Sequence, residues 1–140
     1  MRRNTITGLV LLILSLGFSI SAHPPQDQSF SAFWTKFKAA VIKGDKIAVA
    51  RMSDFPIEMP YGMGSVKTPA QLSKRYRQVF NGETNAAKCF AETEPKVDPE
   101  NPKRFTVGCK IMNTGDVVII YGFARTKTGW KFDSLDNINE

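Results

Sequence analysis

The spacing of apolar residues predicts an amphipathic helix at the start of the globular part of the chain. Between residues 29 and 44 apolar side chains recur at the i, i+3, i+4, i+7 spacing of a helix with one buried face, and Gly44 ends the pattern. The stripe consists of Phe30, Phe33, Trp34, Phe37 and Val41. A second, short helix is expected from about Asp45 to Met52, with an aspartate cap and Ile47, Val49 and Ala50 as its apolar positions.

A capping box predicts the start of a third helix. Thr68-Pro69-Ala70-Gln71 places a hydroxyl cap, a proline at the first helical position and a glutamine three residues after the cap. The helix should run to about Phe80, because Asn81-Gly82 is a stop signal. Its inward positions are Leu72, Tyr76, Val79 and Phe80. Before it, Phe55-Pro56-Ile57 begins an extended segment, since a residue that precedes proline is disfavoured in the α region.

The second half of the chain has the pattern of strands. We expect four of them, over Ala87 to Glu94, Arg104 to Met112, Asp116 to Lys127 and Trp130 to Leu135. A proline-rich loop joins the first two, and short turns that contain glycine join the others as antiparallel hairpins. Three helices followed by a meander predict an α+β domain in which the helices pack on one face of a curved antiparallel sheet.

The first 22 residues have the pattern of an export signal. Arg2 and Arg3 precede an apolar core from Leu9 to Ile20, and small residues favour cleavage after Ser21 or Ala22. An uncleaved anchor is the alternative; the apolar run is short for a stable membrane span. We therefore expect an exported protein, periplasmic or secreted, with residues 1–22 as signal peptide, 23–28 as a flexible leader and 29–140 as one domain.

Composition narrows the function classes. The 140-residue chain has 19 Lys and Arg residues against 13 Asp and Glu, and its apolar content of 42% is that of a globular protein. Removal of Arg2 and Arg3 lowers the formal charge from +6 to +4, and the sequence contains no groove-binding motif, so we expect no nucleic-acid partner. With two cysteines and one histidine, His23 in the leader, we expect no metal site and no cofactor.

The two cysteines predict a structural disulfide. Export allows disulfides to persist, and Cys89 and Cys109 lie on the two strands expected to flank the proline loop. Direct pairing would set Glu94 opposite Arg104 and Ala91 opposite Val107. The alternatives are two buried free thiols or a reactive pair; the latter lacks a C-x-x-C spacing and a nearby histidine.

Three segments resemble the nuclear transport factor 2-like, or SnoaL-like, superfamily, in particular its small exported bacterial members. They are the run from Phe33 to Val41 followed by Gly44-Asp45, the segment Asp54-Phe55-Pro56-Ile57, and Gly129-Trp130 at the start of the last strand. The resemblance implies a cone-shaped, cystatin-like α+β fold with a pocket at its open end. The superfamily includes isomerases, dehydratases and cyclases as well as binding and dimerising modules, so the resemblance indicates fold more than chemistry.

Candidate site residues follow from the pocket that the resemblance implies. A carboxylate beside a tyrosine could transfer protons, and the candidates for that role are Asp54, Asp133 and Tyr121. Each has a structural alternative: a turn cap for Asp54, a surface salt bridge for Asp133 on one face with Lys131 and Leu135, and a buried, hydrogen-bonded hydroxyl for Tyr121. The candidate pocket residues are Trp34, Tyr61, Met63, Tyr76 and Tyr121.

Two hypotheses about function follow, and an inhibitor or immunity protein for a secreted enzyme is a third alternative that no sequence feature favours. The first is an exported, non-enzymatic module that binds a small apolar ligand or a protein partner, with a homodimer through the outer sheet face as one form. The segment Met59 to Gly64 is either a mobile apolar loop at the mouth of the cone or a β-turn. The second hypothesis is a small isomerase or hydrolase that uses Asp and Tyr for proton transfer.

Overall fold

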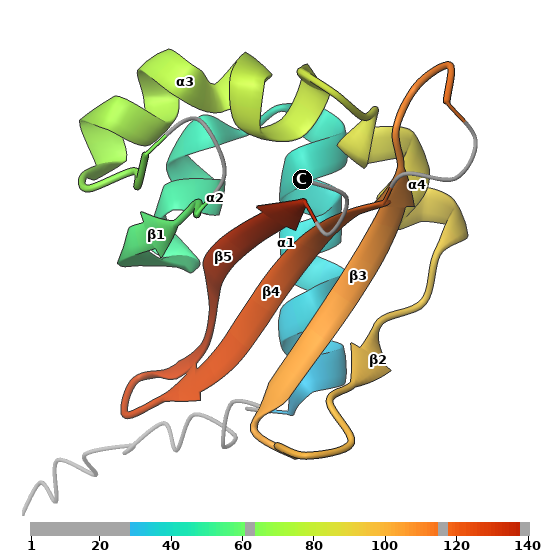
Figure 1. Ribbon diagram of the computed structural model, residues 1–140. Coiled ribbons are helices and arrows are strands. Elements are labelled where there is room, and N and C mark those ends of the chain that lie inside the picture. Colours follow the sequence, from blue (N-terminus) through green and yellow to red (C-terminus); the bar gives the residue numbers. More distant parts are fainter. Residues whose placement is uncertain (1–28, 61–63, 115–117, 138–140) are drawn as a thin grey trace, which may run out of the picture.

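The described part of the chain forms one α+β unit (Figure 1). A computed structural model describes residues 29–60, 64–114 and 118–137. The elements in chain order are α1 (Phe30–Lys43), α2 (Lys46–Arg51), β1 (Ser53–Glu58), α3 (Pro69–Asn81), α4 (Ala86–Glu92), β2 (Lys96–Val97), β3 (Arg104–Lys110), β4 (Val118–Thr126) and β5 (Gly129–Asn137). The signal peptide and the leader predicted for residues 1–28 lie outside the described residues.

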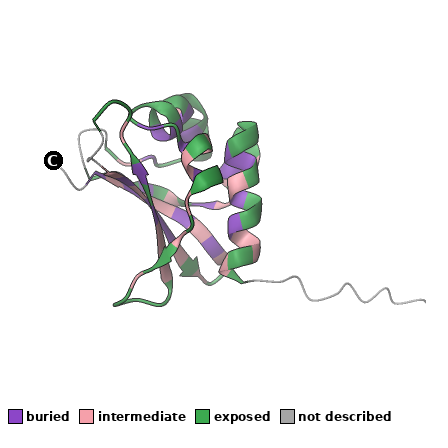
Figure 2. Ribbon diagram, turned by 90° about the vertical axis from the view of Figure 1, so that its right-hand side faces the viewer, coloured by how far each residue is buried: buried purple, intermediate pink, exposed green. Residues whose placement is uncertain are grey.

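The sheet is curved and carries its helices on one face, which confirms the predicted fold class. The strand order is β1-β5-β4-β3-β2, and β2 to β5 form an antiparallel meander. β1 adds to the edge of β5 in parallel. In Figure 1 α1 lies behind the sheet, and in the turned view of Figure 2 the same helix stands on one side of the sheet. No described helix is long and apolar enough to cross a membrane.

The helices begin and end where the sequence predicts. The Ser29 hydroxyl accepts the Ala32 N–H at 3.2 Å, and Gly44 closes α1 with a positive φ of 68°. The Thr68 hydroxyl accepts the Gln71 N–H at the start of α3, while the Gln71 amide oxygen accepts the Lys67 N–H at 2.7 Å. In α2 only Val49 is buried, and Ile47 is 67% exposed, because a helix of this length turns only a narrow face to the core.

An aromatic core joins α1 and α3 to the sheet. Its fully buried phenylalanines are Phe37, Phe80, Phe90, Phe123 and Phe132. Phe37 on α1 meets Phe123 on β4 edge to face at 5.1 Å, and Phe80 on α3 stacks on Tyr121 at 5.8 Å. Burial of each such ring contributes about 2–3 kcal/mol, so the inner part of the cone is filled by side chains that stabilise the fold.

One predicted strand is a helix. Residues Ala87 to Glu94 were expected to pair with the strand from Arg104, but α4 occupies this segment, and the predicted pairs of Glu94 with Arg104 and of Ala91 with Val107 are wrong. The Asn85 side chain caps α4 by accepting the Lys88 N–H at 3.0 Å. Ala86 and Phe90, four residues apart, then point into the core. The short β2 takes the edge position next to β3 instead.

A bulge in β5 changes the face on which its residues lie. Phe132 pairs with Phe123 and Ser134 with Gly122, so Asp133 is an extra residue between two consecutive pairs. The period of two is broken there, and Leu135 is buried while Asp133 is not. The expectation that Asp133 and Leu135 share a face is therefore wrong.

Candidate functional site

A small cavity lies where the C-terminal end of α3 meets the last residues of β5. Its volume is about 40 Å³. It is lined by Met59, Gln78, Val79, Glu83, Thr84, Ile119, Tyr121, Leu135, Asp136 and Asn137. One water takes up about 10–15 Å³ of such a cavity, so the cavity has room for roughly three waters or a compact chemical group. Because Gln78 and Glu83 are exposed, the cavity opens to solvent at its rim.

Tyr121 forms the inner wall of the cavity. Its side chain is fully buried, stacked on Phe80 and edge to face with Phe90 at 4.9 Å. The hydroxyl donates to the Val79 carbonyl at 2.9 Å. Burial raises the pKa of Tyr121 far above its usual range, and the negative charge of Glu83 adds to the shift. The Tyr121 side chain is therefore neutral, and its hydroxyl proton is already donated to the Val79 carbonyl.

The polar part of the wall comes from the segment after α3 and from the end of β5. The Thr84 hydroxyl donates to the Lys110 carbonyl at 2.8 Å, and the Asn137 amide donates to a Glu83 carboxylate oxygen at 3.3 Å. The Glu83 carbonyl accepts the Met112 N–H at 2.9 Å, which fixes the segment against the end of β3. Asp136 differs from these groups: it pairs with Ile120, so its side chain lies on the face of the sheet away from the core, where its Oδ1 is buried and has no hydrogen-bond partner among the described residues.

Two of the predicted pocket residues belong to the core. Trp34 is 5% exposed and packs against Phe90 at 5.0 Å. Tyr76 is 6% exposed, and its hydroxyl finds no partner in the described part of the chain. Burial, with a contribution from Asp45, raises the pKa of Tyr76 to about 12. Of the predicted pocket residues that the structure describes, Tyr121 is the one that lines the cavity; Tyr61 and Met63 lie outside the described residues.

The structure does not bring the proton-transfer candidates together. Asp54 is exposed on β1. Asp133 forms an ion pair with Arg104 at 3.0 Å, and its neighbour Ser134 also contacts that guanidinium. The position opposite Ser134 is Gly122, so this pair lies on the face of the sheet away from the core, whereas Tyr121 points into the core.

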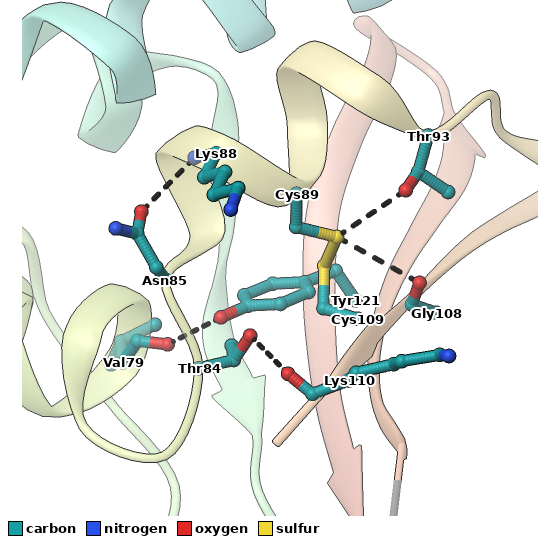
Figure 3. Close-up of a disulfide and its surroundings, with 10 residues drawn as sticks. All are labelled: Val79, Thr84, Asn85, Lys88, Cys89, Thr93, Gly108, Cys109, Lys110 and Tyr121. Atoms are coloured by element: carbon teal, nitrogen blue, oxygen red, sulfur yellow. Dashed lines mark hydrogen bonds between the residues drawn. A yellow bond between two sulfur atoms is a disulfide. The ribbon is translucent and has the colours of Figure 1, made fainter. Parts of the chain in front are cut away.

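Cys89 and Cys109 form the predicted disulfide (Figure 3). It ties α4 to β3 instead of joining two strands, with a Cα–Cα distance of 5.7 Å. Thr93 Oγ1 and the Gly108 carbonyl oxygen each lie 3.7 Å from Cys89 Sγ. Lys110, the residue after Cys109, accepts the Thr84 hydroxyl with its carbonyl, so the bridge lies one residue away from a hydrogen bond of the cavity wall (Figure 3).

Several cavity residues could not have been selected from the sequence. Glu83 follows the Asn81-Gly82 stop, and Asp136 and Asn137 end the last strand, but none belongs to a motif. Met59 lies in the segment that the sequence analysis singled out, and it is buried against the cavity. Among the described residues there is no group of three side chains able to ligate a metal.

No protein-family model matches the chain, and no curated protein sequence matches it. Solved structures do. A nuclear transport factor 2-like protein with a cystatin-like fold from Novosphingobium aromaticivorans is 14% identical, with coverage of 75% of each chain and a TM-score of 0.42. A domain with a cystatin-like fold from Nostoc punctiforme is 15% identical, over 78% of this chain and 74% of that one, with a TM-score of 0.46.

A hexachlorocyclohexane dehydrochlorinase from Novosphingobium barchaimii is also similar, at 15% identity over 75% of this chain and 80% of that one, with a TM-score of 0.43. The chain is similar in fold to nuclear transport factor 2-like proteins. At these identities the likeness concerns the arrangement of helices and strands alone.

Proposed function

We propose that the protein is an exported, non-enzymatic module that binds a small, largely apolar ligand. The observation that carries this proposal is the cavity between α3 and the end of β5. Apolar side chains from β4 and β5, among them Ile119 and Leu135, give it the mixed wall that is typical of small-molecule sites. The signal pattern of residues 1–22 supports export, and a disulfide is compatible with an oxidising compartment.

The enzymatic alternative has less support. A proton-transfer site needs its acid or base within hydrogen-bond reach of the reacting group. Asp54 and Asp133 do not line the cavity, and the Tyr121 proton is held by the Val79 carbonyl. Of the two acidic residues at the cavity, Asp136 pairs with Ile120 on the outer face of the sheet, so an isomerase or hydrolase in this cavity would have to use Glu83.

A second copy of the chain is a further possible partner in this proposal. In Figure 2 the sheet is seen from its side, and the described helices lie on the core side only. The other face contains the half-buried side chains Thr106, Ile120 and Ala124 beside the Arg104–Asp133 pair. A homodimer would bury these side chains without changing the cavity.

Native mass spectrometry of the processed protein, recovered from the exporting cell without reductant, tests export, ligand binding and subunit number together. We expect a chain that starts near His23, has the mass of a disulfide-bonded form, and carries an additional small mass that denaturation releases. The same spectrum reports the number of subunits. A full-length, uncleaved chain would contradict export. A chain that stays empty after exposure to a panel of small apolar compounds would contradict ligand binding.

A further inference from the structure

The exposed side of α1, α2 and α3 is positively charged. None of these three helices contains an acidic residue, and each contains basic ones. The exposed basic residues are Lys36, Lys43, Lys46, Arg51, Lys74 and Arg77. The acidic residues nearest in sequence are Asp45, whose Oδ1 accepts the Ala48 N–H as the cap of α2, and Asp54 on β1. Such a one-sided distribution of charge favours an anionic partner.

A groove of about 310 Å³ lies between α2 and the first turns of α3, where Figure 1 shows the two helices next to each other. It is lined by Lys46, Ile47, Ala50, Arg51, Pro69 and Ser73, and no described acidic residue lines it. Lys46 is held against α3, with its Nζ 3.5 Å from the Ser73 carbonyl oxygen and 5.6 Å from the centre of the Tyr76 ring. Arg77 is four residues after Ser73 and therefore stands on the same side of α3.

Ile47 is the most exposed large apolar side chain of the described residues. It is 67% exposed, and the groove places it beside Lys46 and Arg51. Insertion into the interfacial layer of a bilayer would bury this side chain, while the basic side chains around it would reach the lipid phosphates. A soluble anion would satisfy the charges and leave Ile47 in water. The combination of an exposed isoleucine with unopposed cations therefore fits an anionic membrane surface.

We propose that the surface formed by α2 and the first turns of α3, here called the α2–α3 surface, docks the protein on a bilayer rich in anionic phospholipids. Phosphate oxygens would accept hydrogen bonds from Lys46 and Arg51, and Ile47 would enter the interfacial layer. Neither cation forms an ion pair with a described residue, so docking breaks no such pair there. The inference does not depend on the cavity between α3 and the end of β5.

Binding of the processed protein to lipid vesicles tests the inference. Co-sedimentation compares vesicles of phosphatidylcholine alone with vesicles of equal parts phosphatidylcholine and phosphatidylglycerol. We expect the anionic vesicles to bind at least about ten-fold more tightly, since each basic residue near such a surface contributes about 1 kcal/mol. Added salt should remove most of this difference, because it screens exposed charges. Equal binding to both kinds of vesicle, or no binding to either, would overturn the inference.

Two double variants with the same change of net charge locate the docking surface. Lys46→Gln/Arg51→Gln should weaken binding to the anionic vesicles at least about ten-fold. Lys88→Gln/Lys96→Gln removes two exposed charges from α4 and β2, and β2 is the edge strand opposite β1. It should change the binding much less. An equal loss in the two double variants would show attraction to the net charge of the chain and would overturn the assignment to the α2–α3 surface.

The apolar contact distinguishes a bilayer from other anionic partners. Ile47→Ala should weaken vesicle binding about three-fold or more, whereas Val97→Ala, at a 50% exposed position on β2, should not weaken it. Inorganic phosphate and poly-glutamate should bind at least about ten-fold more weakly than the vesicles at the same concentration of negative charge. Equal binding of phosphate would indicate a soluble-anion site, and equal binding of poly-glutamate an acidic protein partner. Either result, or equal vesicle binding by the two alanine variants, would overturn the membrane assignment.

Discussion

The absence of a side chain at Gly122 leaves space for neighbouring side chains on the outer face of the sheet. A side chain at this position would collide with Ser134 Oγ, and its Cβ would lie 2.8 Å from Arg104 Nη2. In the native chain this space admits the Arg104 guanidinium, whose Nη1 and Nη2 donate to the Asp133 carboxylate at 3.0 and 3.2 Å. Glycine is required here by close approach of side chains from β3 and β5.

We expect Gly122→Ala to destabilise the protein by about 1–3 kcal/mol, because overpacking of a close contact forces the backbone or the ion pair to move. Urea unfolding monitored by tryptophan fluorescence measures the loss. Asp133→Ala should cost less, about 0–1 kcal/mol, since the Arg104–Asp133 pair is partly exposed. In Gly122→Ala/Ser134→Ala part of the loss should return. Equal losses in Gly122→Ala and Asp133→Ala would show that the ion pair, rather than the space, is what matters.

Also at the residue scale, the sequence predicts Tyr121 as a residue of the candidate site and does not predict the acidic residues beside it. Tyr121 could be predicted as a buried, hydrogen-bonded tyrosine because it stands in an apolar strand. Glu83 and Asp136 could not, since their proximity to one cavity depends on how the end of α3 packs beside the end of β5, more than 50 residues later. No local pattern records such a contact.

At the scale of elements, α4 shows that a correctly predicted disulfide can be placed on a wrongly predicted strand. The disulfide between Cys89 and Cys109 was predicted correctly, and pairing of two strands was the simplest way to bring the sulfurs together. The helix has a cap at Asn85, good helix formers such as Ala87, and core contacts at Ala86 and Phe90. In this short segment the cap and the i, i+4 spacing of buried residues were the decisive signals.

The cap of α4 can be tested directly. Asn85→Ala removes the side chain that accepts the Lys88 N–H and should destabilise the protein by about 1 kcal/mol. Asn85→Asp keeps an acceptor at the same place and should retain most of the stability. Chemical denaturation of both variants measures the difference. If Asn85→Asp is as unstable as Asn85→Ala, the cap is not the source of the effect.

The disulfide should stabilise the folded chain mainly by restricting the unfolded one. It closes a loop of 20 residues, for which chain entropy predicts about 3 kcal/mol. Reductant should lower the unfolding midpoint of the native chain to that of Cys89→Ala/Cys109→Ala, and should leave the midpoint of this double variant unchanged. Because Phe90 still anchors α4 in the core, both forms should remain folded at 25 °C. A reductant effect on the double variant would mean that the loss has another cause.

At the scale of the whole molecule, the predicted architecture is right and one non-local pairing was missed. The amphipathic stripe of α1 and the apolar β4 predict helices on one face of a sheet. The parallel addition of β1 to β5 depends on contacts across 80 residues, among them Phe132 N–H to the Met52 carbonyl at 2.9 Å and the Lys131 ammonium to the Arg51 carbonyl at 2.7 Å. Such a pairing leaves no periodic trace in either segment.

The two buried tyrosines couple the stability of the whole fold to alkaline pH. The pKa of Tyr76 rises from 10.0 to about 12, and that of Tyr121 rises further, because burial disfavours the phenolate. The folded state therefore keeps both protons at a pH where the unfolded state has lost them. This stabilisation is complete below pH 10 and declines as the pH rises above 10, at a slope of at most about 1.4 kcal/mol per pH unit for each tyrosine. The contribution of Tyr76 is lost as the pH passes 12, and that of Tyr121 continues to fall above this pH.

Tyr76→Phe and Tyr121→Phe are a matched pair for this effect, and their neutral-pH stabilities should differ. The Tyr76 hydroxyl has no partner among the described residues, so its removal should leave the stability at pH 7 unchanged or slightly higher. The Tyr121 hydroxyl donates to the buried Val79 carbonyl, so its removal should cost about 1 kcal/mol. Each variant should flatten the decline of stability between pH 10 and 12, as measured by urea unfolding at a series of pH values. If neither variant changes the slope of the free energy of unfolding against pH, the alkaline loss of stability arises from groups other than Tyr76 and Tyr121.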